Sequence, residues 1–200
     1  MKQIHATTVL CVARNKQIVM MSDSQVTAGF TICKDDYNKL RTLTKPDSDL
    51  KVIAGFSGTV TDCLALSDKL KEILEETAND LRKAVSKLAK QWKTDRNLRR
   101  YSAEIIVADS YGDMYAIDGH GLIIRPSENR GMILSTGSGS VHAYAAALAL
   151  YRENPAMDAK KIVEKAMTIA SELDVFTNNK FNMLEIKGTK TRAKDSIEED

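Results

Sequence analysis

Three side chains in the first forty residues carry groups that could act together in catalysis: the hydroxyl of Thr7, the carboxylate of Asp23 and the ammonium of Lys39. A threonine hydroxyl is one of the groups that enzymes use as a nucleophile, and a carboxylate and a cation could act beside it. Taken singly, each has an ordinary structural explanation, since Thr favours strands, Asp favours turns and Lys is mostly a surface cation. The three therefore become candidates only through the sequence around them.

Two other sources of chemistry receive little support. His5, His120 and His142 are scattered, and no Gly-x-Ser-x-Gly motif is present, so a serine hydrolase triad is not indicated. Gly137-Ser-Gly139 lies between a predicted strand and a predicted helix, where backbone N–H groups could bind an anion. It lacks the further glycine, the lysine and the spacing of a phosphate-binding loop, which favours a tight turn with a serine cap.

The most basic segment, 82–100, predicts a helix that holds eight Lys or Arg residues and one acid, Asp95. The basic segment could face nucleic acid, but the segment 62–80 holds six acids against two lysines and could offset its positive charge. Trp92 is the only aromatic residue in 82–100, which offers little for stacking on single strands. We favour a solvated helix or a protein contact surface and expect no nucleic-acid partner; salt-dependent binding to DNA or RNA would support the alternative.

The composition describes one globular domain with a sizeable core, since the chain has 200 residues and is 43% hydrophobic. A net charge of +2 gives no general reason for binding a polyanion or a membrane. Cys11, Cys33 and Cys63 form no CxxC pair, so neither a disulfide framework nor a zinc site is indicated, and a reducing cytoplasm is the simplest location. No apolar run reaches the about 18 residues of a membrane helix, and residues 1–6 lack the apolar core of a secretory signal.

The hydrophobic pattern predicts strands, then two helices, then strands, then two helices. Strands are expected at 7–12 and 18–21, joined as a hairpin, and at 51–56, 103–108, 113–117, 122–125, 132–135 and 181–186. Apolar residues at helical spacing predict helices at 63–74, from Leu81 to Arg100, at 141–151 and at 158–173.

This run-wise order favours an α+β fold over a parallel βαβ sheet. We expect two antiparallel sheets stacked between two helical layers, which is a four-layer αββα sandwich. Residues 7–187 would form this single domain after a six-residue leader, 1–6. Residues 188–200 lack apolar periodicity and end in Ile-Glu-Glu-Asp, so they are expected to form a disordered polar tail.

From Thr7 to about Ile186 the chain resembles the HslV peptidases, ATP-dependent bacterial relatives of proteasome β subunits. Several motifs at compatible spacings carry the resemblance: Thr7-Thr-Val9, Ser22-Asp-Ser-Gln-Val-Thr27 followed by Lys39, Val52-Ile-Ala-Gly-Phe-Ser-Gly58, Trp92-Lys-Thr-Asp-Arg-Asn-Leu-Arg99, Gly137-Ser-Gly139 and Thr177-Asn178. The fold of that family is the αββα N-terminal-nucleophile sandwich, which agrees with the element order.

The resemblance implies a threonine endopeptidase that is matured by cleavage of the Ala6–Thr7 bond, with residues 1–6 as a propeptide. A free Thr7 would combine a hydroxyl nucleophile with its own α-amine, whose ordinary pKa of about 7.7 to 8.0 suits a general base. Lys39 would lie close to that hydroxyl and favour deprotonated neighbours, while Asp23 would orient and neutralise Lys39. The Gly58 backbone N–H would be the oxyanion donor.

Ser138 matches the family serine that completes the hydrogen-bond network near the threonine amine. Asp174 stands where HslV often has Cys and so resembles the Asp-x-x-Ser of true proteasome β subunits. We expect Asp174 to supplement the network of Thr7 and Ser138. The same segment resembles the family's monovalent-cation site, built from the backbone carbonyls of Ser171, Asp174 and Thr177, so a sodium ion is expected there and no cofactor is required for the chemistry.

The resemblance also implies the partners: a homododecamer of two stacked hexameric rings, the hexameric AAA+ ATPase HslU as unfoldase and allosteric activator, and unfolded proteins as substrates. Ser24 replaces a glycine that is usual after the aspartate, and Thr44 to Asp49 lengthens a loop, but neither change removes a residue assigned to chemistry. An inactive or scaffold ring subunit is the alternative, and the retention of Met1 in assembled particles would support it.

Overall fold

The computed structural model describes residues 7–45, 48 and 50–188. The propeptide expected at 1–6 therefore lies outside the described residues, as does the tail expected at 188–200 apart from Gly188. Eleven strands and four α-helices lie within the described part of the chain. None of those helices is long and apolar enough to cross a membrane.

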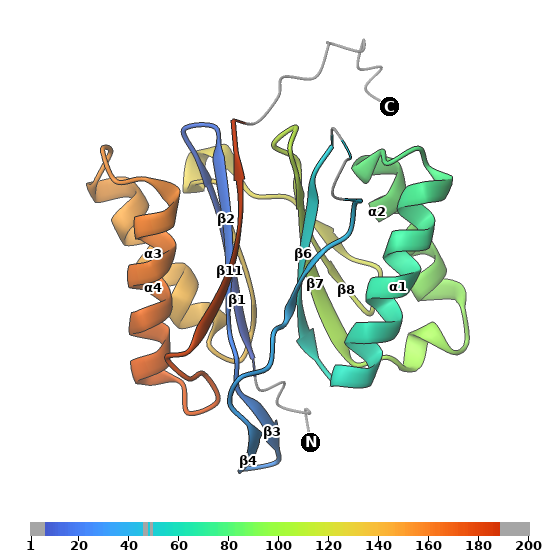
Figure 1. Ribbon diagram of the computed structural model, residues 1–200, viewed down its shortest axis with the longest axis horizontal. Helices are drawn as coiled ribbons and strands as arrows, with labels where there is room; N and C mark the ends of the chain where they lie inside the picture. Colours follow the sequence, from blue (N-terminus) through green and yellow to red (C-terminus); the bar gives the residue numbers. More distant parts are fainter. Residues whose placement is uncertain (1–6, 46–47, 49, 189–200) are drawn as a thin grey trace.

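Two antiparallel sheets lie face to face between two pairs of helices (Figure 1), which confirms the αββα expectation. The first sheet has the order β10-β1-β2-β11, and the second has the order β5-β6-β7-β8-β9. Their strands are β1 Thr8–Arg14, β2 Gln17–Asp23, β10 Ile133–Gly137 and β11 Phe181–Lys187 in the first, and β5 Leu40–Thr42, β6 Val52–Gly58, β7 Ala103–Asp109, β8 Met114–Asp118 and β9 Ile123–Ile124 in the second.

The helices cover the outer faces of the two sheets, α3 and α4 on the first and α1 and α2 on the second (Figure 1). Their bounds are α1 Val60–Glu76, α2 Leu81–Thr94, α3 Ser140–Glu153 and α4 Ala159–Leu173. Asp80 and Asp158 cap α2 and α4 by accepting hydrogen bonds from backbone N–H groups of the first turn. Such caps satisfy donors that a helix start would otherwise leave unpaired.

Each central strand is buried on both faces, so successive side chains enter different cores. In β1, Val9 and Cys11 lie in the core between the sheets, whereas Leu10 and Val12 pack under α3 and α4. This explains why the run from Val9 to Val12 is continuously apolar instead of alternating with polar residues. The same alternation places the side chains of Thr7 and Thr8 on opposite faces of the first sheet.

Two sequence expectations were wrong, and three short strands were missed. The basic helix expected to run to Arg100 ends at Thr94, because Asp95 turns the chain and accepts hydrogen bonds from the N–H groups of Asn97 and Leu98. The strand expected at 122–125 is only two residues long, Ile123–Ile124. Strand β5 was not predicted, nor was the small hairpin of β3 Val26–Ala28 and β4 Thr31–Lys34, which projects from one end of the sandwich (Figure 1). These elements are short, and the residues of β3 and β4 are mostly exposed, so they show no alternation of apolar and polar residues that would predict a strand.

Candidate active site

The predicted site residues come from separate elements that end at the same edge of the sandwich. Thr7 directly precedes β1, Asp23 ends β2, Lys39 directly precedes β5 and Gly58 ends β6. Strand pairing sets their positions, since β1 and β2 run antiparallel with Val9 opposite Ser22. In an antiparallel pair the first residues of one strand lie beside the last residues of the other, so Thr7 and Asp23 lie at the same end of the sheet.

Asp23 is the centre of a buried hydrogen-bond cluster. Its Oδ1 accepts from Lys39 Nζ at 2.7 Å and from the Thr8 N–H at 2.8 Å. Its Oδ2 accepts from the Gln25 N–H at 2.8 Å. The predicted pairing of Asp23 with Lys39 is therefore present, and the same carboxylate also fixes the backbone next to Thr7.

Burial dominates the acid–base behaviour of this ion pair. It lowers the pKa of the Lys39 ammonium, and the charge of Asp23 opposes that shift only in part. Burial also raises the pKa of Asp23, against the charge and hydrogen bond of Lys39 and the two backbone N–H groups. Both directions follow from the cost of keeping charges away from water. A lysine with a lowered pKa is better able to exchange a proton with its neighbours than a surface lysine.

Thr7 is held by the turn between β10 and α3. Its carbonyl accepts the Ser138 N–H at 2.8 Å, and its nitrogen donates to Ser138 Oγ at a longer 3.4 Å. Gly137 has φ +94°, and a Cβ at this position would lie 1.9 Å from the Thr7 carbonyl oxygen. Only glycine fits there, because both the backbone conformation and the close approach exclude a side chain. The turn therefore positions the Thr7 backbone.

Ser138 has a different role from the helix cap expected for the Gly-Ser-Gly segment. Helix α3 begins after Gly139, and no side chain caps it. The Ser138 hydroxyl instead donates to Asp174 Oδ2 at 2.7 Å. The cap interpretation was wrong because it rested on the local Gly-Ser-Gly sequence alone, whereas the family resemblance had placed Ser138 in a network with Asp174.

The Asp174 carboxylate receives a second hydroxyl, that of Thr177, at 2.5 Å on the same Oδ2 atom. Thr177 Oγ1 lies 2.7 Å from Thr8 Oγ1, which also accepts the Gly139 N–H at 3.0 Å. Thr8 and the Thr177 side chain were not predicted as site residues. The sequence feature that could have indicated Thr8 is its polar side chain at the start of a run of apolar residues.

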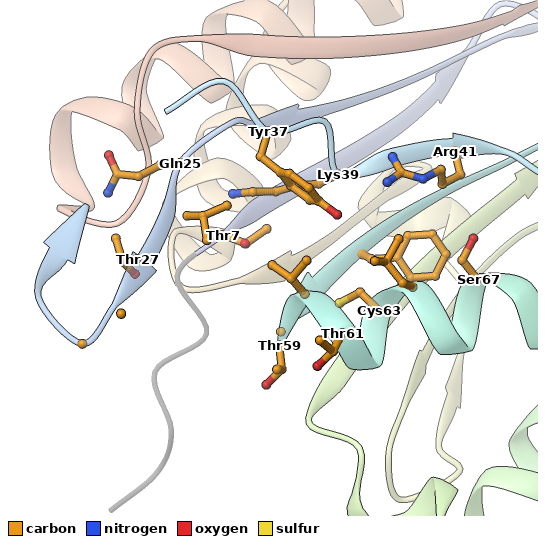
Figure 2. A pocket seen from close by; sticks show the side chains of 17 residues that line it. Thr7, Gln25, Thr27, Tyr37, Lys39, Arg41, Thr59, Thr61, Cys63 and Ser67 are labelled. Atoms are coloured by element: carbon orange, nitrogen blue, oxygen red, sulfur yellow. The ribbon is translucent and has the colours of Figure 1, made fainter. Parts of the chain in front are cut away.

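A pocket of about 420 Å³ opens beside Thr7 (Figure 2). Figure 2 shows the Lys39 side chain extending toward Thr7 along one wall, with Cys63 on the other side of the cavity. Gly58 also lines the pocket, so its backbone adjoins the space next to Thr7. The lining contains no carboxylate, and its members are Thr7, Gln25, Val26, Thr27, Ala28, Gly29, Tyr37, Lys39, Arg41, Phe56, Gly58, Thr59, Val60, Thr61, Cys63, Leu64 and Ser67.

The residues expected to bind a cation lie in the last turn of α4 and the loop after it. Ser171 is in the helix, Asp174 follows its end, and the Thr177 N–H donates to the Asp174 carbonyl at 3.0 Å. A carbonyl oxygen has a second lone pair, so the Asp174 carbonyl retains the capacity to bind a cation. Within the described residues no group of three His, Cys, Asp or Glu side chains could hold a metal, so a cation here would depend on carbonyls.

Comparisons with known proteins agree with this architecture. A family model described as proteasome subunit matches residues 4–186. The chain is 44% identical over 181 residues to the ATP-dependent protease subunit HslV of Pseudothermotoga lettingae, which covers 90% of this chain and 98% of that protein. It is 43% identical over 187 residues to the subunit of the same name from Sulfurihydrogenibium sp., with 94% and 100% covered.

Solved structures give the same result. A crystal structure of eukaryotic HslV from Trypanosoma brucei matches with a TM-score of 0.81 and 38% identity, covering 90% of this chain and 99% of that one. The fold also resembles Thiobacillus denitrificans BPH in complex with epoxomicin, with a TM-score of 0.66, 17% identity, and 92% and 100% covered. The second likeness concerns the fold alone.

Proposed function

Because this chain belongs to the proteasome family as an HslV-type subunit, and is therefore an N-terminal threonine peptidase, we propose that it is the proteolytic core of an ATP-dependent protease. In this function an AAA+ unfoldase, a hexameric HslU partner, hydrolyses ATP, unfolds protein substrates and feeds them to the peptidase. The names of the relatives support this proposal, since they are called ATP-dependent protease subunits.

The proposed reaction starts with removal of residues 1–6, which frees the amine of Thr7. That amine then takes the proton of the Thr7 hydroxyl as the oxygen attacks the substrate carbonyl. The C–N bond of the substrate breaks, the new amine leaves with the proton, and an acyl ester remains on Thr7 Oγ1. Water hydrolyses the ester and regenerates the free hydroxyl.

Lys39 and Asp23 prepare this attack. The Lys39 cation extends along the pocket wall toward Thr7 and favours deprotonated groups nearby, while Asp23 fixes it through the 2.7 Å ion pair. The Gly58 N–H serves as the oxyanion donor, since Gly58 lines the pocket with Thr7. The loss of such a donor typically costs about 10²–10³-fold in turnover.

Ser138 and Asp174 act on the amine side of Thr7. Ser138 Oγ accepts from the Thr7 nitrogen, which is a peptide N–H before cleavage, and donates to Asp174; after cleavage the carboxylate would orient the hydroxyl that holds the amine. A sodium ion bound by the carbonyls of Ser171, Asp174 and Thr177 would stabilise the loop that carries this carboxylate. The ion would have no role in bond breaking.

The working particle in this proposal is a dodecamer of two hexameric rings that encloses the pockets in a chamber. A chamber restricts cleavage to unfolded chains that a partner inserts, which explains the need for an ATPase. We place the particle in the cytoplasm, in keeping with the free thiols of Cys11, Cys33 and Cys63.

One observation carries the proposal: Asp23 binds both Lys39 and the backbone N–H of Thr8, directly next to Thr7 at the pocket wall. The test is the intact mass and N-terminal sequence of the purified protein, with Thr7→Ala as the control. We expect the wild type to begin at Thr7 and to hydrolyse fluorogenic peptides, and the variant to retain residue 1 and be inactive. A wild type that retains its leader after assembly would contradict the proposal and support a scaffold subunit.

A further inference from the structure

The side chain of Thr8 lies behind the nucleophile, on the face of the first sheet that α3 and α4 cover. It is completely buried, and it follows the same face as Leu10 and Val12, which are apolar. Burying a hydroxyl is unfavourable unless its hydrogen bonds are made, and Val would fill the same volume in a strand without that cost. A threonine at this position therefore indicates that its hydroxyl has partners that matter.

Those partners form a continuous chain of hydrogen bonds that ends on a carboxylate. The Gly139 N–H donates to Thr8 Oγ1 at 3.0 Å, Thr8 Oγ1 lies 2.7 Å from Thr177 Oγ1, and Thr177 donates to Asp174 Oδ2 at 2.5 Å. The packing around Gly139 is an independent sign of how closely they converge. A Cβ on that glycine would lie within 3.0 Å of Thr8 Oγ1, Thr177 Oγ1 and Asp174 Oδ2.

The direction of every bond in this chain follows from its two ends. An ionised carboxylate only accepts and a backbone N–H only donates. Thr177 gives its single hydroxyl proton to Asp174, so the bond between the two threonines must be donated by Thr8. Thr8 in turn accepts from Gly139, and each hydroxyl then donates once and accepts once. We call this chain, from Gly139 N–H through Thr8 and Thr177 to Asp174, the threonine relay.

We propose that Thr8 is a positioning residue of the peptidase, which acts through the threonine relay to hold the Asp174 carboxylate where it can accept the Ser138 hydroxyl. Ser138 has two acceptors within reach, Asp174 Oδ2 at 2.7 Å and the Thr7 carbonyl at 3.3 Å. When its proton points to Asp174, the Ser138 oxygen turns its lone pairs toward the Thr7 nitrogen, from which it accepts at 3.4 Å. Without the relay, Asp174 still accepts the Phe176 N–H on Oδ1, at a long 3.4 Å, but Oδ2 is held less firmly and Ser138 donates more often to the Thr7 carbonyl.

This proposal rests on the proposed function, since it concerns how the Thr7 amine is held as a general base. The charged or titratable groups around that amine are Asp174, reached through Ser138, and the buried pair of Lys39 and Asp23, and the pocket next to Thr7 is also lined by Tyr37, Arg41 and Cys63. A carboxylate held close to an amine favours its protonated form and raises its pKa. Weakening the relay should therefore move the acid limb of the pH profile to lower pH while it reduces turnover.

The test compares Thr8→Val, which removes the hydroxyl and keeps the shape, with Thr8→Ser, which keeps the hydroxyl. Full-length variants are first checked by intact mass for Thr7 at the N-terminus and by size for assembly. We expect Thr8→Val to lower kcat by about tenfold, equivalent to the loss of one hydrogen bond. KM should stay within about twofold and the acid limb of kcat/KM should move to lower pH. Thr8→Ser should remain within about twofold of the wild type.

A double-mutant cycle with Asp174→Asn separates the relay from simple packing. If Thr8 acts through Asp174, adding Thr8→Val to Asp174→Asn should cost less than about twofold. A full additional loss in that background, an unchanged pH profile in Thr8→Val, or a Thr8→Ser variant as impaired as Thr8→Val would overturn the proposal. If Thr8→Val fails to mature or assemble, Thr177→Val interrupts the same relay from its other end and is judged by the same criteria.

The wild type, measured in parallel, keeps this inference apart from the proposed function. An inactive wild type that retains residues 1–6 would contradict the proposed function itself. An active wild type that begins at Thr7, together with a fully active Thr8→Val, would contradict only the role of Thr8.

Discussion

The Ser138 hydroxyl donates to Asp174 Oδ2 at 2.7 Å, across a separation of 36 residues in the chain. The bond joins the turn before α3, which contacts Thr7, to the loop after α4, whose Thr177 contacts Thr8. Ser138 also donates its backbone N–H to the Thr7 carbonyl at 2.8 Å. This one turn therefore fixes the Thr7 backbone. Through the Ser138 hydroxyl it also links the Asp174 carboxylate to the Thr7 nitrogen.

Replacing Asp174 by Asn tests this connection. The change keeps the shape but removes the charge, so the amine of Thr7 should have a lower pKa and Ser138 a weaker acceptor. We expect kcat to fall by about tenfold and the acid limb of kcat/KM to move to lower pH, measured with a fluorogenic peptide from pH 5 to 9. Glu172→Gln, an exposed carboxylate near the end of the same helix, is the matched control and should behave as wild type. Unchanged hydrolysis and an unchanged pH profile in Asp174→Asn would rule out a role for this carboxylate.

The buried ion pair predicts a stability defect that depends on pH. Lys39→Met leaves the Asp23 carboxylate buried without its cation, which typically costs about 3–5 kcal/mol, and it should abolish peptide hydrolysis. Burial already raises the pKa of Asp23, and the loss of the lysine charge should raise it further. The folded state then binds a proton more tightly than the unfolded state, so the defect should be smaller at pH 5 and larger at pH 8.

Urea denaturation at the two pH values measures this effect. Lys34→Met is the matched control, because Lys34 pairs with Asp36 at 2.7 Å on the exposed β3–β4 hairpin. It should leave the midpoint unchanged, since exposed ion pairs contribute little. A Lys39→Met variant with the same loss of stability at pH 5 and pH 8 would show that Asp23 does not take up a proton.

Gly137→Ala should disrupt the turn that holds Thr7. A methyl group there would meet the Thr7 carbonyl oxygen at 1.9 Å in a backbone conformation with φ +94°. Gly112→Ala is the matched control, since Gly112 has φ +89° with no atom within 4 Å of the added carbon. We expect the control to lose about 1 kcal/mol of stability, from the strained φ, and to mature normally. Gly137→Ala should not mature, as judged by intact mass, and equal behaviour of the two variants would contradict the steric explanation.

Cys63 should be a slow target for alkylation although it lines the pocket. Burial raises the pKa of its thiol to about 12, so little thiolate is present at neutral pH. Iodoacetamide should label the exposed Cys33 first, and labelling of Cys63 should rise about tenfold per pH unit between pH 8 and 10. Peptide mapping by mass spectrometry measures both sites in one sample. Rapid labelling of Cys63 at pH 8 would contradict a raised pKa of its thiol.

The sequence by itself determined the layers of this protein. Long apolar runs such as 103–108 and strong helical periodicities such as 158–173 arise because many consecutive residues are buried. The types and the order of these strands and helices were therefore predicted correctly. The short strands β3, β4 and β5 were not, because three or four residues carry too little pattern. The helix in the basic segment ends at Thr94 instead of Arg100, because the turn formed by the Asp95 side chain competes with the helix.

The site divides in the same way. Thr7, Asp23, Lys39, Gly58, Ser138 and Asp174 could be named from residue types and from the motifs of a known family. What only the tertiary structure decided was the connection through Thr8, since the Gly139 N–H reaches the Thr8 hydroxyl across 131 residues and Ser138 reaches Asp174 across 36. Local sequence cannot encode such contacts, because they depend on which strand edges and loops the packed sheets bring together. For that reason the local sequence favoured a helix cap at Ser138, and only the family resemblance linked Ser138 to Asp174, while Thr8 was predicted solely as a strand residue.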